Sequence, residues 1–179
     1  MNPFDFKFLL RGFADATDEG RLHAVLDEAV HALGFEQFAM GHHVDLTGPP
    51  RDAIRLTSYH ADWIDESVER RYFVDDPVHK ASVRCATGFL WSDIPTLIDV
   101  SGRQQCILER ARRFGLVEGY TVPVPVPGEY RGTCSFGARS TLRLRPDALP
   151  LCQLIDTYAR AASCARGCAG VSACVRCRD

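Results

Sequence analysis

Aromatic and acidic side chains are spaced through residues 59–91 in a way that suits a ligand rather than only a core. Tyr59 stands four residues before Trp63, and Asp76 stands thirteen residues after Trp63. An indole N–H and a phenol donate hydrogen bonds and a carboxylate accepts them, so these residue types could pair the polar atoms of a ligand. Trp91, fifteen residues after Asp76, adds an aromatic surface. The pattern favours binding over catalysis, because no nucleophile, base and orienting group stand at the spacing of a catalytic triad.

Two of these residues also have a purely structural interpretation. Trp63 can be a core aromatic whose indole N–H is satisfied locally. Asp76 precedes Pro77, and an Asp before a proline at the first helical position is a good helix start, which makes Asp76 an N-cap. The two interpretations are compatible for Asp76, because a carboxylate has lone pairs for both a backbone amide and a ligand.

Hydrophobic periodicity predicts the elements that would position these residues. Residues 61–72 read as a helix, because Ile64, Val68 and Tyr72 recur every four residues. A helix over 77–86 is expected to stop at Gly88, with a strand beginning at 89–91. Other predicted helices cover 4–13, 18–33 with Thr17 as its N-cap, 101–114, and a last helix from Pro146 with Leu151, Leu154, Ile155 and Tyr158 on its apolar face. Predicted strands cover 35–44, 53–59, 120–126 and 131–138, with an edge or an irregularity at Pro123 and Pro125 and turns at 45–50 and 127–130.

The motifs in their order resemble a known family. The residues that carry the likeness are Tyr59, Trp63, Tyr72, the pair Asp76-Pro77, the run GFLWS at 88–92, the segment GLVEGYTVP at 115–123 and the run GTCSF at 132–136. Together they resemble the autoinducer-binding domain of LuxR-type quorum-sensing regulators, over roughly residues 1–165. The resemblance implies an α+β fold, an α-β-α sandwich with a roughly five-stranded antiparallel sheet and a ligand between the sheet and the helices of 61–86. The domain is expected over 1–163, followed by a Cys-rich tail over 164–179.

The resemblance also implies a ligand and a role for each site residue. The family's ligand is an N-acyl homoserine lactone, bound without a cofactor or a metal. Trp63 would donate to the lactone carbonyl, and Asp76 would accept from the amide N–H. Tyr59 and Ser135 would donate to the carbonyl of the acyl amide, while Trp91 would pack against the lactone ring.

Two further positions in the predicted site depart from the family pattern. Ser67 stands four residues after Trp63, where many members have a Tyr, so the pocket is expected to be wider or more polar on that wall. Val78, two residues after Asp76, offers no hydroxyl where some members do. Tyr72 completes the predicted set of ligand-binding residues. The acyl-chain length and substitution stay open, and so does a ligand of another class.

Composition sets the broad class of the protein. With 179 residues, 46% of them apolar and 25% charged, the chain suits one globular domain with a full core. A net charge of −2 gives no basic surface for nucleic acid or anionic membrane. No apolar run approaches the roughly 20 residues of a membrane span, and the N-terminus has no cleavage signal. We therefore expect a cytoplasmic protein with reduced cysteines, four of which read as core fillers: Cys85, Cys106, Cys134 and Cys152.

The remaining polar features indicate no second site. Zinc is disfavoured at the tail cysteines, because five residues separate Cys168 from Cys174, and at His42 and His43, because neighbours on a strand point to opposite faces. Arg110, Arg112 and Arg113 read as a solvated helix face. Beyond residue 163 the sequence has no room for a helix-turn-helix, so direct DNA binding is not expected.

Three functions follow as alternatives. The first is a lactone sensor that forms homodimers. The second is a ligand-independent anti-activator that forms heterodimers with a full-length LuxR-type regulator. The third, an enzyme or metal protein using the cysteines and histidines, is the least favoured by the sequence.

Overall fold

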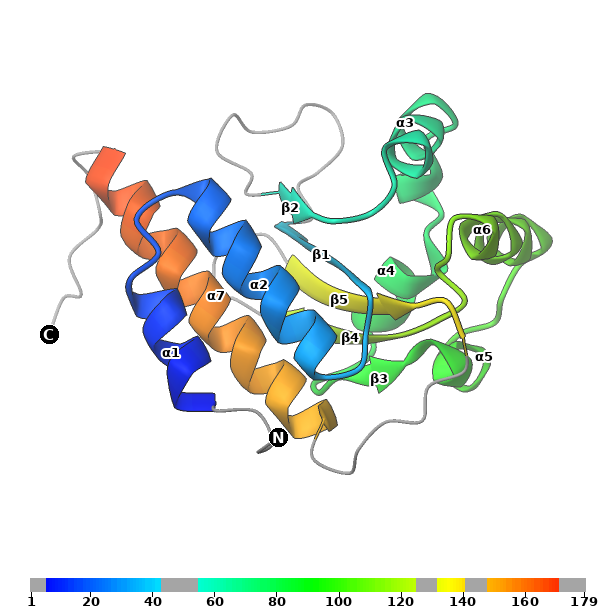
Figure 1. Ribbon diagram of the computed structural model, residues 1–179. Helices are drawn as coiled ribbons and strands as arrows, with labels where there is room; N and C mark the ends of the chain where they lie inside the picture. The colour runs from blue at the N-terminus through cyan, green and yellow to red at the C-terminus, as the bar shows by residue number, and fades with distance from the viewer. Residues whose placement is uncertain (1–5, 43–54, 125–131, 141–147, 171–179) are drawn as a thin grey trace, which may run out of the picture.

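Helices cover both faces of a five-stranded antiparallel sheet in three layers (Figure 1). The computed structural model describes residues 6–42, 55–124, 132–140 and 148–170. Helices α1, α2 and α7 form one outer layer, and α3 to α6 form the other (Figure 1). The strand order is β2-β1-β5-β4-β3. The predicted α-β-α sandwich is therefore confirmed.

The sheet is built from β1 (Gln37–His42), β2 (Arg55–Thr57), β3 (Phe89–Leu90), β4 (Glu118–Val124) and β5 (Gly132–Ala138). Its register places Ala39 opposite Ser135 and Ser135 opposite Thr121. Strand β3 pairs with β4 only at Tyr120 and Thr121, so Pro123 has a strand neighbour on one side alone. The predicted edge at Pro123 is confirmed, whereas Pro125 and the two predicted turns lie outside the described residues.

The first helical layer contains α1 (Phe6–Ala14), α2 (Glu19–Ala32) and α7 (Ala148–Gly170). Helix α2 begins one residue later than predicted, because the carboxylate of Asp18 accepts from the Arg21 amide at 2.8 Å and is the N-cap. The hydroxyl of Thr17 donates to that carboxylate instead. Gly34 ends α2 with φ +90°, a left-handed conformation that suits glycine.

The second layer is made of short elements: α3 (Ala61–Glu69), the 3-10 turn η1 (Tyr72–Val74), α4 (Pro77–Ser82), the 3-10 turn η2 (Trp91–Asp93), α5 (Ile94–Leu97) and α6 (Gly102–Arg113). Two predicted helices are shorter than expected. The predicted helix over 77–86 ends at Ser82. The predicted helix over 61–72 ends at Glu69, and Arg71 turns the chain with φ 54°. The predicted stripe through Val68 is wrong, since Val68 is 52% exposed and Trp63 is the buried residue of α3.

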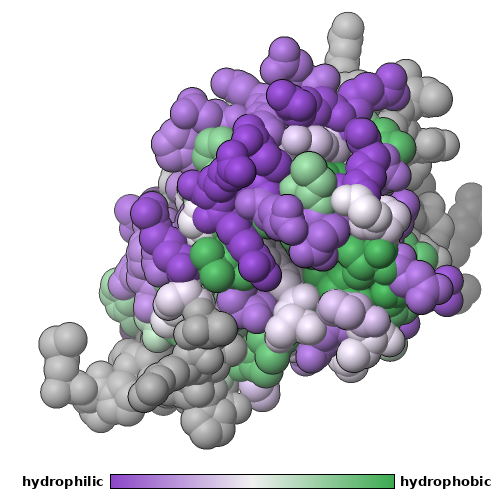
Figure 2. Space-filling model, turned by 90° about the vertical axis from the view of Figure 1, so that its right-hand side faces the viewer, coloured by the Kyte–Doolittle hydropathy of each residue, from purple (hydrophilic) through white to green (hydrophobic). Residues whose placement is uncertain are grey.

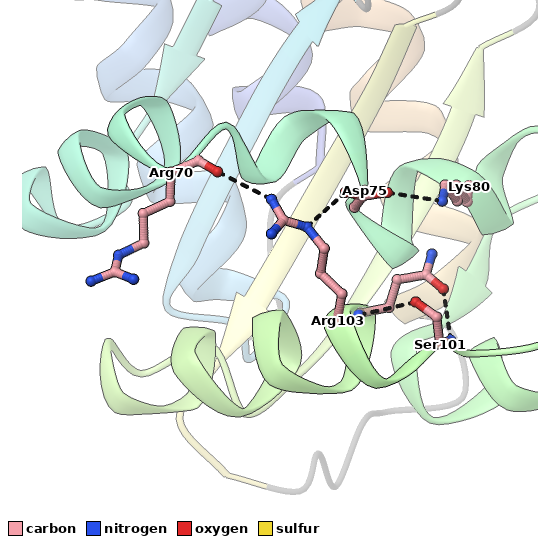
Figure 3. Close-up of polar contacts among 6 residues, drawn as sticks. Arg70, Asp75, Lys80, Ser101 and Arg103 are labelled. Atoms are coloured by element: carbon pink, nitrogen blue, oxygen red, sulfur yellow. Dashed lines mark hydrogen bonds and ion pairs between the residues drawn. The ribbon is translucent and has the colours of Figure 1, made fainter.

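Ion pairs on the surface tie the turn before Asp76 to α6 (Figure 3). Arg103 of α6 donates to Asp75 at 2.7 Å and to the carbonyl of Arg70 at 3.3 Å. Lys80 of α4 donates to the other Asp75 oxygen at 3.3 Å. Ser101 and Gln104 form a capping box that begins α6. The chain from α3 to α4 is thus held at both ends of η1.

Helix α7 buries a different face from the predicted one. Ile155 is fully buried as predicted, but Leu154 and Tyr158 are 40% and 38% exposed. The other buried residues of this helix within the described part of the chain are Ala148, Cys152, Asp156, Ala159 and Ser163. Small residues and a carboxylate took the place of the expected large apolar ones, so a pattern of large side chains alone misplaced the helix face.

A buried ion pair lies on the same helix. Arg160 donates to Asp156 at 2.7 Å, and burial raises the pKa of Asp156 to about 6 although Arg160 opposes the rise. Among the cysteines expected in the core, Cys134 and Cys152 are buried, whereas Cys106 is exposed and that prediction is wrong. Within the described residues, no helix is long and apolar enough to cross a membrane.

Candidate ligand-binding site

The two faces of the sheet carry side chains of very different size. Alternate residues of a strand point to opposite faces. Toward α1, α2 and α7 the strands present Phe38, Met40, Tyr120, Val122, Cys134 and Phe136, all in one buried cluster. Toward α3–α6 most intervening positions of the same strands are small, namely Ala39, Gly41, Gly119, Thr121, Ser135 and Gly137, and Gln37, Pro123 and Thr133 complete this face. The second face therefore has less side-chain volume of its own than the first.

Aromatic residues of the second layer face these small residues. Trp63 packs against Tyr72 and Phe114, with ring centroids 5.7 and 5.6 Å apart. Tyr59 and Trp91 are partly buried against the same cluster. The indole N–H of Trp63 makes no hydrogen bond within the described part of the chain. That donor is therefore available beside the sheet.

The hydroxyl of Tyr72, by contrast, is already used. It donates to Glu66 at 3.0 Å, and Arg110 of α6 donates to the same carboxylate at 2.8 Å. The hydrogen bond from Arg110 is the main cause that lowers the pKa of Glu66. Arg110 is therefore a tie between α6 and α3, and its predicted place on a solvated face is wrong; Arg112 and Arg113 are exposed. The outer face of this layer is mostly hydrophilic, with separate apolar patches (Figure 2).

Asp76 caps α4 and remains a buried acceptor. Its carboxylate accepts from the Val78 amide at 2.8 Å, which confirms the predicted N-cap. Burial is the largest influence on its pKa and raises it, against the helix amides that lower it. Tyr59 lies near, because the charge of Asp76 adds to the burial that raises the pKa of Tyr59 far above its usual range. Both side chains keep some accessible surface although they are removed from bulk water.

A chain of hydrogen bonds crosses the small-residue face between β3 and β5. The indole N–H of Trp91 donates to the hydroxyl of Thr121 at 2.9 Å. Thr121 and Ser135 share a hydrogen bond of 2.8 Å between their hydroxyls. Ser135 in turn lies close enough to Tyr59 for its hydroxyl to oppose the rise in the pKa of that phenol. We call Trp91, Thr121 and Ser135 the hydroxyl chain.

Thr121 is the member of this group that the sequence interpretation missed. Its signal was present, since Thr121 is the threonine of the segment 115–123, and in the register it stands directly opposite Ser135. The pairing of two strands was needed to bring the two hydroxyls together.

Trp91 lies over two glycines that pair with each other across β4 and β5. A Cβ on Gly119 would come within 2.6 Å of the Trp91 ring, and a Cβ on Gly137 within 3.5 Å. The close approach of the indole to the sheet thus requires the missing side chain at Gly119. The predicted strand at 89–91 ends one residue early for the same reason: Trp91 opens η2 and turns its ring onto the sheet.

The structure brings together most of the predicted site residues. Tyr59, Asp76 and Ser135 converge, and Trp63, Tyr72 and Trp91 lie in or against one aromatic cluster. Ser67 has a buried hydroxyl with no hydrogen-bond partner among the residues that the structure describes. Val78 lies apart from this cluster and packs beside Ala81, Phe89 and Ile94.

No metal site accompanies this arrangement within the described residues. No three His, Cys, Asp or Glu side chains there come close enough to hold an ion. His43 and the tail residues Cys174 and Cys177 lie outside the described part of the chain.

Donors and an acceptor between a small-residue sheet face and an aromatic wall define a ligand-binding domain. The family model described as the autoinducer binding domain matches residues 18–162. The chain therefore belongs to the autoinducer-binding domains of LuxR-type quorum-sensing regulators.

Known proteins similar to this chain agree with that family. The quorum sensing-dependent transcriptional regulator RpaR of Rhodopseudomonas palustris is 32% identical over 98 residues, 55% of this chain and 40% of RpaR. The quorum-sensing regulator RhlR of Pseudomonas aeruginosa is 30% identical over 112 residues, 62% of this chain and 44% of RhlR. The chain thus spans less than half the length of both. A solved structure of SdiA in complex with octanoyl-rac-glycerol shares the fold, with a TM-score of 0.73 and 20% identity over 93% of this chain and 69% of that one.

Proposed function

We propose that this chain is a sensory domain that binds an N-acyl homoserine lactone between the sheet and helices α3 and α4. The observation that carries the proposal is the convergence of Asp76, Tyr59 and Ser135, one acceptor and two hydroxyl donors. An amide offers the matching pair, an N–H for the carboxylate and a carbonyl for the hydroxyls. Matching matters, because a buried donor or acceptor without a partner costs about 1 to 3 kcal/mol.

The lactone ring of the ligand contacts residues around the group formed by Asp76, Tyr59 and Ser135. The free indole N–H of Trp63 suits the lactone carbonyl, and the ring of Trp91 packs against the lactone. Tyr72 forms part of the wall with its ring, because its hydroxyl is held by Glu66. Val78 contributes through its amide, which holds Asp76 in place, more than through its side chain.

Ser67 sets the wall near the acyl chain. Its position one turn after Trp63 places both on neighbouring parts of one helix face. A serine leaves more room than a tyrosine, and its unpartnered hydroxyl favours a chain that carries a hydrogen-bonding group. The ligand panel below therefore includes oxo- and hydroxy-substituted chains.

The protein acts by binding and not by catalysis in this proposal, without a cofactor, and in the cytoplasm. We keep residues 1–163 as the domain, although α7 itself continues to Gly170. Direct DNA binding by these 179 residues is not part of the function, since their net charge is −2.

The partner is a second chain of the same family, either another copy or a full-length regulator. Exposed apolar residues on the first and last helices favour this part of the proposal: Phe8 is 63% exposed, Leu154 40% and Tyr158 38%. Helices α1 and α7 pack side by side, so the three residues belong to one layer (Figure 1). Inhibition of a full-length partner, with or without ligand, is the second candidate function.

Thermal unfolding with a panel of ligands tests the binding proposal. A ligand that binds only the folded chain at a hundred times its Kd adds about 2.7 kcal/mol to the free energy of unfolding. The panel contains lactones of several chain lengths and 1-octanoyl-rac-glycerol, in which an ester without an N–H replaces the amide and two glycerol hydroxyls replace the lactone ring. A shift with lactones supports the proposal, a shift with the glycerol ester alone assigns another ligand class, and no shift in folded protein contradicts ligand sensing.

A further inference from the structure

We propose that Trp91, acting through Thr121, makes Ser135 a hydrogen-bond donor toward the ligand and so determines that the ligand atom facing Ser135 and Tyr59 is an acceptor. Thr121 is then a positioning and specificity residue, although it does not touch the ligand. The inference rests on the proposed binding site, but its first test needs no ligand.

The direction of the hydroxyl chain begins at Trp91. An indole N–H can only donate, so the oxygen of Thr121 accepts from Trp91 over the 2.9 Å contact. Within the described residues, the hydroxyl of Thr121 has one other partner, Ser135, at 2.8 Å. Thr121 is fully buried, so its hydrogen has no access to water.

The hydrogen of Thr121 must therefore go to Ser135. If Ser135 donated to Thr121, the oxygen of Thr121 would accept twice and its own hydrogen would have no acceptor. A buried donor left unused costs about 1 to 3 kcal/mol, which is enough to favour one direction at least tenfold. Only the arrangement in which Thr121 donates leaves every group of the chain satisfied.

Ser135 consequently turns its own hydrogen away from Thr121, toward Tyr59 and the ligand. Tyr59 can pass the direction on, because a phenol that accepts from Ser135 still has its own hydrogen to donate. The hydrogen presented to the site thus comes from Ser135 itself or, when Ser135 donates to Tyr59, from Tyr59, while the Asp76 carboxylate faces the site as an acceptor. A ligand with the reverse order, an N–H toward Ser135 and a carbonyl toward Asp76, would meet donor against donor and acceptor against acceptor.

The packing of the Trp91 ring against the sheet supports the inference independently. The ring lies on Gly119 and Gly137, where even a methyl group on Gly119 would collide with it. A ring held so closely keeps its N–H aimed at Thr121 whether or not a ligand is present. Without that donor, the pair of hydroxyls could adopt either direction at equal cost.

The first experiment uses the ligand-free 179-residue chain and two variants of Thr121. Thr121→Val keeps the shape and removes the hydroxyl, whereas Thr121→Ser keeps the hydroxyl. The chain has two tryptophans, so its indole N–H resonances in a nitrogen-15 NMR spectrum can be assigned with Trp91→Phe. We expect the Trp91 resonance to move and its exchange with water to quicken in Thr121→Val, and to stay near the wild-type position in Thr121→Ser. An unchanged resonance in Thr121→Val would overturn the proposal.

The second experiment compares an acyl homoserine lactone with its thioamide, in which a weaker acceptor replaces the amide carbonyl. Thr121→Val removes the hydrogen bond that Ser135 accepts, so the Ser135 hydroxyl is no longer held in one direction and must be ordered by the ligand. The variant should therefore bind the amide up to about tenfold less tightly and lose clearly less with the thioamide. Thr121→Ser should bind both as the wild type does. The double variant Trp91→Phe/Thr121→Val should lose no more affinity than the loss in Thr121→Val added to the lost packing of the Trp91 ring. The reason is that both substitutions break the same hydroxyl chain.

Equal losses for the amide and the thioamide in Thr121→Val would show a general structural effect and overturn the inference. Absence of any lactone binding by the wild type is a different outcome, since it contradicts the proposed function while the NMR result still reports on the hydroxyl chain.

Discussion

Asp76 has two tasks at once, capping α4 and accepting from the proposed ligand, and one substitution separates them. Asp76→Asn should weaken lactone binding by about 1.5 to 3 kcal/mol, roughly ten- to a hundredfold, because a charged acceptor is replaced by a neutral one. Stability should change little, since Asn is also a good N-cap and can accept from the Val78 amide. Titration calorimetry and urea unfolding measure the two effects.

Asp75→Asn is the matched control for that experiment. Asp75 is the neighbouring carboxylate, but it points to Arg103 and Lys80 on the outside (Figure 3). Its replacement should leave lactone affinity much closer to the wild type. Unchanged affinity together with lost stability in Asp76→Asn would show that Asp76 serves α4 alone.

At the level of single residues, the sequence predicted local roles better than contacts between residues that are distant along the chain. Asp76 as an N-cap followed from local pattern and is confirmed. Trp63 is buried, as its structural interpretation expects, but its indole N–H has no local partner among the described residues. Thr121 was missed because its importance comes from the register of β4 on β5, which no local pattern contains. Cys106 was placed in the core because its neighbours are apolar, yet its side chain lies on the exposed side of α6.

Among the secondary-structure elements, α7 carries a charge in its buried face, and this makes its packing dependent on pH. Burial raises the pKa of Asp156 from its ordinary 3.8 to about 6, so the folded protein holds this proton more tightly than the unfolded chain does. The resulting stabilisation is fully present below about pH 4 and is lost as the pH rises through about 6. The difference corresponds to about 3 kcal/mol.

Urea unfolding at several pH values checks this expectation with Asp156→Asn. The variant lacks the titrating group, so the stability of the wild type relative to the variant should fall by about 3 kcal/mol between pH 4 and pH 7. Asp65→Asn, at an exposed position of α3, is the control and should follow the wild type. Parallel curves for wild type and Asp156→Asn would contradict the assignment.

The order and type of most elements were predictable, and their ends and faces were less so. Periodicity identified α2 because large apolar residues mark its buried side, and it identified α6 through Ile107 and Ala111. The same rule failed for α3 and α7, where Val68, Leu154 and Tyr158 are exposed. In α7 the buried side carries Ile155 as its one fully buried large residue within the described part of the chain, and the rest are small or polar residues that a pattern of large apolar side chains does not identify.

For the molecule as a whole, the exposed side chains of α1 and α7 predict self-association. Leu154→Glu should shift the chain toward monomer in sedimentation equilibrium, because a charge placed in an apolar interface loses its hydration. Val68→Glu changes a similarly exposed residue on the opposite helical layer and should leave the association unchanged. A monomeric wild type, or equal effects of both variants, would contradict this interface.

The same variants decide the inhibitory role. A pair of this 179-residue chain with a full-length relative would contain fewer DNA-reading domains than a pair of full-length chains, so operator binding by the relative should fall as the chain is added. The fall should be lost with Leu154→Glu and kept with Val68→Glu. No fall with the wild type would leave ligand sensing as the function.

The unequal faces of the sheet divide the molecule into two parts that should open to solvent separately. The large face and α1, α2 and α7 share one continuous apolar cluster, whereas α3 to α6 rest on two smaller clusters. Regions with fewer buried apolar contacts open at lower free energy. Backbone amides of α3, α4 and α6 should therefore exchange with deuterium faster than those of α2 and α7 in the free chain, and a bound lactone should slow the first group and leave the second unchanged. Such a result would mean that the helices that bind the ligand are also the helices that the ligand stabilises.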